Sequence, residues 1–163
     1  FGRWKKILNL TLPKKQKMML YRSASIHYAQ AIAHANLGNI QAAKESASKY
    51  EEFRALPEGK KRILHNNTVA SLLDVDSLMI EGEIAYFEGK FETAFEKLRD
   101  AVDLQDKLNY DEPWGKMQPI RHALAGLLLK RGILDEAEEV YREDLRRLPK
   151  NPWSLKGLIN CLR

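Results

Sequence analysis

The sequence predicts an all-α fold, an α-solenoid of antiparallel helix-turn-helix units with insertions. Apolar residues recur at helical spacing along most of the 163 residues. Four glycines, Gly2, Gly38, Gly89 and Gly132, are each followed two residues later by a bulky apolar residue and five residues later by Ile7 or an alanine. No stretch shows the alternation of apolar and polar residues that is typical of a strand.

The glycine pattern indicates tight turns between paired helices. Glycine suits such a turn because it adopts backbone angles that other residues resist. Ala43, Ala94 and Ala137 each stand five residues after a glycine, where a small side chain lets the second helix pack closely against the first. The glycines are unevenly spaced, so we expect insertions between the units.

The units divide one solenoid domain into seven parts. In order, we expect a half-repeat over residues 1–10, hairpin 1 over 14–55, a linker or short extra helix over 56–67, hairpin 2 over 68–108, a loop over 109–117, hairpin 3 over 118–149 and the start of a further repeat over 150–163. The half-repeats and the first residue, a Phe, indicate a fragment of a longer protein.

Local signals place the first helices. Hairpin 1 contains one long helix over 14–37, which follows a break at Pro13, and its partner over 39–55. Pro57 and Gly59 then interrupt the helical pattern.

Capping residues and breakers place the later helices. Hairpin 2 begins behind Asn66, Asn67 and Thr68, which are all good helix caps, and its second helix spans 91–108. Two prolines and a glycine mark the loop that follows. The remaining predicted helices span 118–131, 134–147 and 151–162.

These motifs carry a family resemblance. The Gly/bulky/Ala pattern, together with Leu148-Pro149 and Asn151-Pro152-Trp153, resembles the tetratricopeptide-repeat superfamily. Residues 1–8 (FGRWKKIL), 27–38 (HYAQAIAHANLG) and 110–158 are similar, more narrowly, to the C-terminal part of a largely uncharacterised group of longer proteins with this repeat. The resemblance implies protein–protein interaction. The basic clamp with which some such domains hold a chaperone's C-terminal carboxylate is absent at the corresponding positions, where Glu83 would repel a carboxylate.

The charge balance permits an acidic partner without requiring one. The formal net charge is +5 and the pI is about 9.3. The cationic clusters are Lys14, Lys15 and Lys17, then Lys60, Lys61 and Arg62, then Arg146 and Arg147. A single cysteine excludes an internal disulfide and weakly favours an intracellular setting, although the compartment stays open. No apolar run reaches the length of a membrane span.

The loop after hairpin 2 is the first candidate site. Tyr110, Glu112 and Trp114, with Arg121 and His122 just beyond, could form a polar pocket, because long loops in compact repeat arrays are often functional. The competing interpretation is structural: Glu112 and Arg121 pair to brace the loop, while Trp114 fills a gap between hairpins.

The inner surface made by the first helices of the hairpins is the second candidate site, because repeat proteins bind partners there. Met79, Tyr86 and Phe87 form an apolar anchor for a peptide or helix, unless neighbouring helices or upstream repeats cover them. Trp153 is expected at an apolar surface with Leu155, Leu158 and Leu162. The candidate partner-binding residues are therefore Met79, Glu83, Tyr86, Phe87, Tyr110, Glu112, Trp114, Arg121, His122 and Trp153.

We predict no catalytic residue, metal site or cofactor. His27 and His34 share a helix face two turns apart, too far for one metal ion without a third element, so they are expected to be packed histidines. The sequence contains no phosphate-binding glycine loop, no HExxH and no GxSxG.

The predicted function is that of a non-enzymatic scaffold or subunit that binds a protein or peptide in a groove and associates with further chains through its terminal half-repeats. One alternative is an RNA-associated helical repeat that uses the basic clusters. A second is a small-ligand sensor or enzyme domain built on the Tyr110–His122 region.

Overall fold

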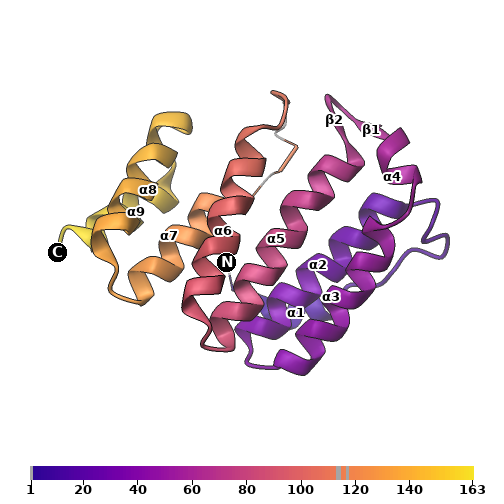
Figure 1. Cartoon of the computed structure of the whole chain (residues 1–163), viewed down its shortest axis with the longest axis horizontal. Coiled ribbons are helices and arrows are strands. Elements are labelled where there is room, and N and C mark those ends of the chain that lie inside the picture. The colour runs from indigo at the N-terminus through magenta and orange to yellow at the C-terminus, as the bar shows by residue number, and fades with distance from the viewer. Residues whose placement is uncertain (1, 113–114, 117) are drawn as a thin grey trace. The chain divides into compact units, whose positions relative to one another are not determined.

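The computed structural model describes all residues except 1, 113–114 and 117. The chain is mostly helical, which confirms the all-α prediction, and Figure 1 shows the succession of helices. It divides into two compact units, residues 1–115 and 116–163.

The first unit contains two helical hairpins and a small β-hairpin. Its elements are α1 (Trp4–Leu8), α2 (Leu20–Asn36), α3 (Ile40–Arg54), α4 (Glu58–Lys61), β1 (Ile63–Leu64), β2 (Asn67–Thr68), α5 (Val69–Phe87) and α6 (Phe91–Asp106). Helix α2 packs against α3, and α5 packs against α6. Helix α5 also packs against α2 and α3, and α1 packs against α2.

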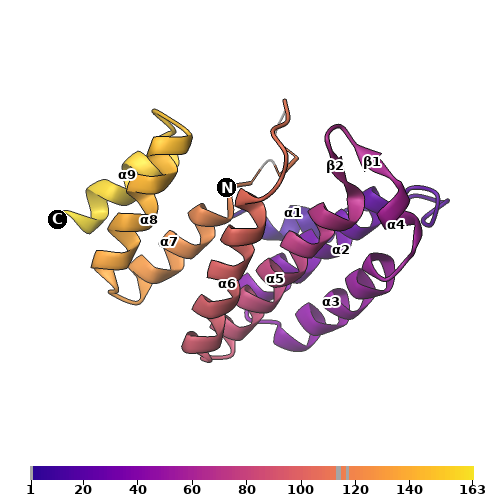
Figure 2. The same cartoon turned by 45° about the horizontal axis from the view of Figure 1, so that its top comes forward.

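The first unit has a layered arrangement. In Figure 2, α1 and α3 lie on opposite sides of α2, and α6 lies beside α5. Helix α5 uses different sides for its contacts, because Asp74 pairs with Arg54 of α3 and Glu81 pairs with Lys97 of α6. We call the side of α5 opposite to Asp74 and Glu81 the inner face.

The described residues of the second unit form three helices. They are α7 (Ile120–Lys130), α8 (Leu134–Arg147) and α9 (Pro152–Cys161). Helix α8 packs against both α7 and α9, and α7 also contacts α9. On the surface of α8, Glu138 pairs with Arg142 and Glu143 with Arg147, each at 2.7 Å, as the four-residue spacings predict.

The predicted turn glycines all adopt the left-handed backbone conformation. The φ angles of Gly2, Gly38, Gly89 and Gly132 are 61°, 79°, 81° and 73°. No atom lies within 4 Å of a Cβ added at the last three of these glycines. Glycine is therefore needed in these turns because of the backbone conformation. It is not needed because of crowding, since a Cβ would have room. The alanines five residues later in the three complete hairpins are fully buried, as predicted.

The predicted start of one helix is wrong. Helix α2 begins at Leu20, not at residue 14, and residues 14–19 form bends and turns. Ser23 Oγ, in the first turn of α2, donates back to the Gln16 carbonyl at 3.1 Å and so holds this turn in place.

Strand pairing is also present where none was predicted. Ile63 pairs with Thr68 and Leu64 with Asn67 in an antiparallel ladder. His65 makes the reversal with a φ of 54°. Two residues per strand are too few for an alternating pattern, which explains why the sequence did not indicate them.

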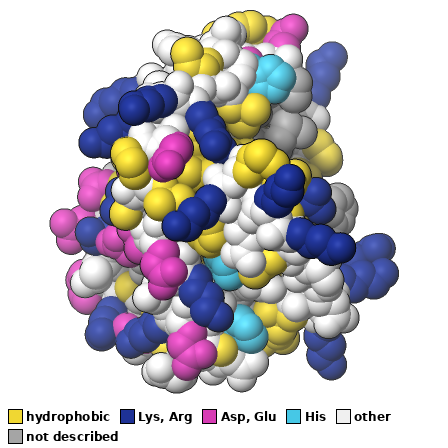
Figure 3. Space-filling model, turned by 90° about the vertical axis from the view of Figure 1, so that its right-hand side faces the viewer, with side chains coloured by type: hydrophobic (Ala, Val, Ile, Leu, Met, Phe, Trp, Pro, Cys, Tyr) yellow, Lys and Arg dark blue, Asp and Glu magenta, His cyan; other side chains and the backbone are white. Residues whose placement is uncertain are grey.

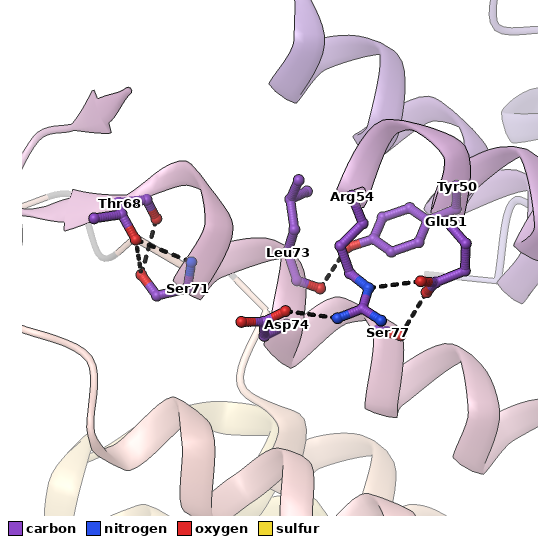
Figure 4. Close-up of polar contacts among 8 residues, drawn as sticks. All are labelled: Tyr50, Glu51, Arg54, Thr68, Ser71, Leu73, Asp74 and Ser77. Atoms are coloured by element: carbon purple, nitrogen blue, oxygen red, sulfur yellow. Dashed lines mark hydrogen bonds and ion pairs between the residues drawn. The ribbon is translucent and has the colours of Figure 1, made fainter. Parts of the chain in front are cut away.

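Polar contacts join α3 to α5, as Figure 4 shows. The buried Tyr50 hydroxyl donates to the Leu73 carbonyl at 2.5 Å. Arg54 bonds both Glu51, at 2.6 Å, and Asp74, at 2.8 Å. The start of α5 is capped as predicted, because Thr68 Oγ1 accepts from the Ser71 amide at 3.1 Å.

Candidate functional site

The inner face of α5 carries two of the predicted binding residues, and both are buried. Asp76, Met79 and Glu83 follow one another at intervals of three and four residues, so they share one side of the helix. Asp74 and Glu81, on the opposite side, form ion pairs with α3 and α6. The Asp76–Glu83 side is therefore directed away from these two ion pairs, and Asn36 of α2 meets it at Glu83.

Burial changes the role of Met79. Its side chain is 0% exposed, while Asp76 and Glu83 are 1% and 6% exposed. Met79 therefore belongs to the core of the first unit, and its side chain is not accessible to a partner in this structure. The alternative that neighbouring elements cover this surface agrees with the burial.

Polar groups of α2 meet the buried carboxylates. Asn36 Nδ2 donates to Glu83 Oε2 at 2.7 Å and to the Ile32 carbonyl at 3.0 Å. Burial raises the pKa of Tyr28 well above its ordinary value, and the nearby charges of Asp76 and Glu83 raise it further. The Tyr28 hydroxyl is therefore neutral at physiological pH. Together these groups form a largely buried polar cluster between α2 and α5.

The two predicted aromatic anchors belong to a larger aromatic cluster. The Tyr86 ring lies edge-on to Phe87, Phe91 and Phe95, with centroid distances of 5.4, 5.3 and 6.0 Å. Tyr86 and Phe87 are partly exposed. Tyr86 thus joins α5 to the start of α6, and part of this cluster remains at the surface.

The loop after α6 contributes Tyr110 and Glu112 to the surface. Tyr110 is 72% exposed, and its hydroxyl donates to the Glu112 carboxylate. That hydrogen bond is the main reason why the pKa of Tyr110 is raised. Trp114 lies outside the described residues. Arg121 and His122 belong to the second unit, whereas Tyr110 and Glu112 belong to the first.

Asparagines of the β-hairpin hold the same loop. Asn66 Nδ2 donates to the Tyr110 carbonyl at 2.8 Å. Asn67 accepts from the Asn109 amide at 2.8 Å and donates to the Asn109 carbonyl at 3.0 Å. Asp111 is buried and accepts from the Asn66 amide at 3.3 Å. The sequence indicated Asn66 and Asn67 only as helix caps, because nothing local to them points to a loop more than forty residues later.

In the second unit, His122 belongs to a polar network centred on Asp144. Asp144 Oδ2 lies 3.0 Å from His122 Nε2 and accepts from Asn151 Nδ2 at 2.7 Å and from Ser154 Oγ at 2.6 Å. Burial acts to raise the pKa of Asp144, but the bonds from these three side chains outweigh it, so the pKa is lowered. All three side chains meet one carboxylate oxygen, so Ser154 is not activated by His122. The arrangement joins α7, α8 and α9, while Arg121 beside it is buried.

Helix α9 presents an apolar surface. Leu155, Ile159 and Leu162 are 43%, 46% and 61% exposed. Their spacing of four and three residues places them on one side of α9, and we call this row the α9 stripe. Trp153 is 54% exposed but lies off the stripe, and Leu158 is half-buried. The prediction of exposed apolar residues is therefore confirmed for Trp153, Leu155 and Leu162.

The histidines of α2 are packed, as predicted. His27 is buried, and its ring stacks on Phe53 with a centroid distance of 5.6 Å. Burial lowers the pKa of His27. The Nδ1 atoms of His27 and His34 are buried without a hydrogen-bond partner. Among the described residues, no group of three or more His, Cys, Asp or Glu side chains could hold a metal ion.

Comparisons with protein-family models, curated proteins and solved structures give no match to this chain. The tetratricopeptide resemblance therefore stays a prediction. In the part of the chain that the structure describes, no helix is both long and apolar enough to cross a membrane.

Proposed function

We propose that the chain is a non-enzymatic scaffold that binds a helical segment of a protein partner along the α9 stripe. The observation that carries this proposal is the row of exposed Leu155, Ile159 and Leu162 on one side of one helix. Such a row matches the way in which an amphipathic helix docks, through anchors three, four and seven residues apart. The inner face is a weaker candidate in this structure, because Asp76, Met79 and Glu83 are buried.

The proposal is tested by affinity purification of the full-length protein, followed by mass spectrometry. Ile159→Glu places a charge in the middle of the stripe without touching the core. We expect it to remove the protein partners that the unmodified protein retains, because truncating or charging a central apolar anchor typically costs about 2 kcal/mol or more of binding.

Asn160→Glu is the matched control. It adds the same charge to the next residue, which is exposed and points away from the stripe. We expect this variant to recover the same protein partners as the unmodified protein. We expect those partners to be recovered after nuclease treatment as well. The proposal fails if Ile159→Glu and the unmodified protein recover the same proteins in the same amounts. Partners that disappear with nuclease would instead favour RNA association.

A further inference from the structure

Two basic segments of the first unit, residues 14–19 and 58–64, form a surface that we call the basic end. They contain six cationic side chains, Lys14, Lys15, Lys17, Lys60, Lys61 and Arg62, against one carboxylate, Glu58. The net charge of these short segments equals the +5 of the whole chain. All five lysines are exposed.

The two segments are joined by a direct hydrogen bond, although more than forty residues separate them. The Arg62 guanidinium donates to the Met18 carbonyl at 2.7 Å. The Lys15 carbonyl accepts from the Met19 amide at 3.0 Å, and Ser23 holds the Gln16 carbonyl, so the first segment is an ordered turn. Figure 1 shows both segments at the end of the first unit that carries the β1–β2 hairpin.

Aliphatic side chains are exposed among these cations. Met18, Met19 and Ile63 are 60%, 40% and 70% exposed. Figure 3 faces this end and shows Lys and Arg side chains spread over the surface with hydrophobic side chains between them, while acidic side chains lie mainly toward the left of the view. Neither segment contains Phe, Tyr or Trp.

We propose that the basic end docks on the surface of an anionic lipid bilayer. Lysine and arginine clusters are attracted to acidic headgroups by about 1 kcal/mol for each charge near the surface. Met18 and Ile63 would enter the boundary between headgroups and acyl chains, where apolar side chains add to the electrostatic attraction. Single-stranded nucleic acid, the other polyanion to consider, is typically bound by aromatic side chains on which bases stack, and this surface has none.

Co-sedimentation with vesicles tests the electrostatic part. The protein is mixed with phosphatidylcholine vesicles with and without phosphatidylserine. We expect binding only when phosphatidylserine is present, and weaker binding as salt rises. Changing Lys14, Lys15 and Lys17 together to Ser should lower the partition coefficient about 100-fold, from about 1 kcal/mol for each lysine. The matched control changes three exposed lysines elsewhere, Lys107, Lys130 and Lys156, to Ser and should lower it only a few-fold.

A second variant distinguishes a membrane from a nucleic acid. Met18→Ser combined with Ile63→Ser keeps every charge and removes the side chains that would insert. It should lower vesicle binding at least tenfold, because burying even one aliphatic side chain contributes about 1.5–3 kcal/mol. Binding of a single-stranded RNA, measured in parallel, should not change.

Three results would overturn the proposal: equal binding to both kinds of vesicle, an unchanged partition coefficient for the variant that combines Met18→Ser with Ile63→Ser, or RNA binding tighter than vesicle binding. The last would assign the basic end to nucleic acid. Circular dichroism of each variant confirms that the helices are intact.

Discussion

The Asp144 network gives the sharpest test of how the second unit is held together. Its carboxylate is 2% exposed, and one oxygen binds side chains from α7, from the start of α9 and from the residue that caps α9. Asp144→Ala removes the acceptor and leaves its three partners in place. We expect this single change to loosen α7, α8 and α9 together.

The magnitude follows from the burial of each partner. Ser154 is fully buried, so its hydroxyl would lose its acceptor in a place that water does not reach, at a cost of about 1–3 kcal/mol. His122 and Asn151 are half-buried and can regain water, so each should cost less. Asn151 also caps α9 by accepting from the Ser154 amide at 2.9 Å, and Asp144 orients that cap. The total is about 3 kcal/mol, on the order of 100-fold in the unfolding equilibrium.

Native-state amide hydrogen exchange is the appropriate assay, because it reports the stability of each region separately, whereas a melting curve of two units need not be two-state. Exchange of amides in α7–α9 should accelerate on the order of 100-fold in Asp144→Ala, while exchange in α2–α6 stays unchanged. The control is Glu139→Ala, an exposed carboxylate on the same helix, which should shift stability by about 0.5 kcal/mol or less. An acceleration in α7–α9 below about fivefold would refute the argument that this network holds the unit.

The other predictions concern packing, backbone and pH. Gly157→Ala should destabilise the second unit by about 1–3 kcal/mol or more, because its Cβ would lie 2.1 Å from the Tyr141 ring; faster amide exchange in α7–α9 measures this loss. Gly89→Ala should destabilise the α5–α6 hairpin by about 1–2 kcal/mol through its φ of 81° alone, seen as faster exchange there. Thr68→Ala should cost about 1 kcal/mol at the start of α5, detected in the same way. The pKa of Asp144 is lowered in the folded protein, so its carboxylate stabilises the second unit fully above the ordinary aspartate pKa of about 3.9. This stabilisation is lost as pH falls through the folded pKa. Asp144→Asn should abolish this acid dependence of amide exchange in α7–α9.

The sequence predicted features that depend on neighbours along the chain. Gly38, Gly89 and Gly132 have the predicted backbone conformation, and the Glu138–Arg142 pair has the predicted partner. These features need only one turn or one helix, so the residues that determine them lie within a few positions of each other. Thr68 is a cap for the same reason.

Features that depend on distant residues were missed or misassigned. Met79 was predicted as an anchor because its spacing fits an inner surface, but spacing does not reveal that this surface is covered. Asp144 was not singled out, since its partners His122 and Ser154 lie on two other helices. The approach of Asn66 and Asn67 to the loop after α6 likewise depends on the packing of α5 against α6.

The basic end shows how one local error hides a distant contact. If α2 began at residue 14, the Met18 carbonyl would accept from the amide of Arg22 inside the helix. Because α2 begins at Leu20 instead, the Met18 carbonyl lies before the helix, and it accepts from Arg62. That bond joins the two lysine clusters, which the sequence gives only as separate groups. The late start of α2 is thus the structural reason that six cationic side chains meet at one end of the first unit, and it explains why charge counting along the chain could not predict this surface.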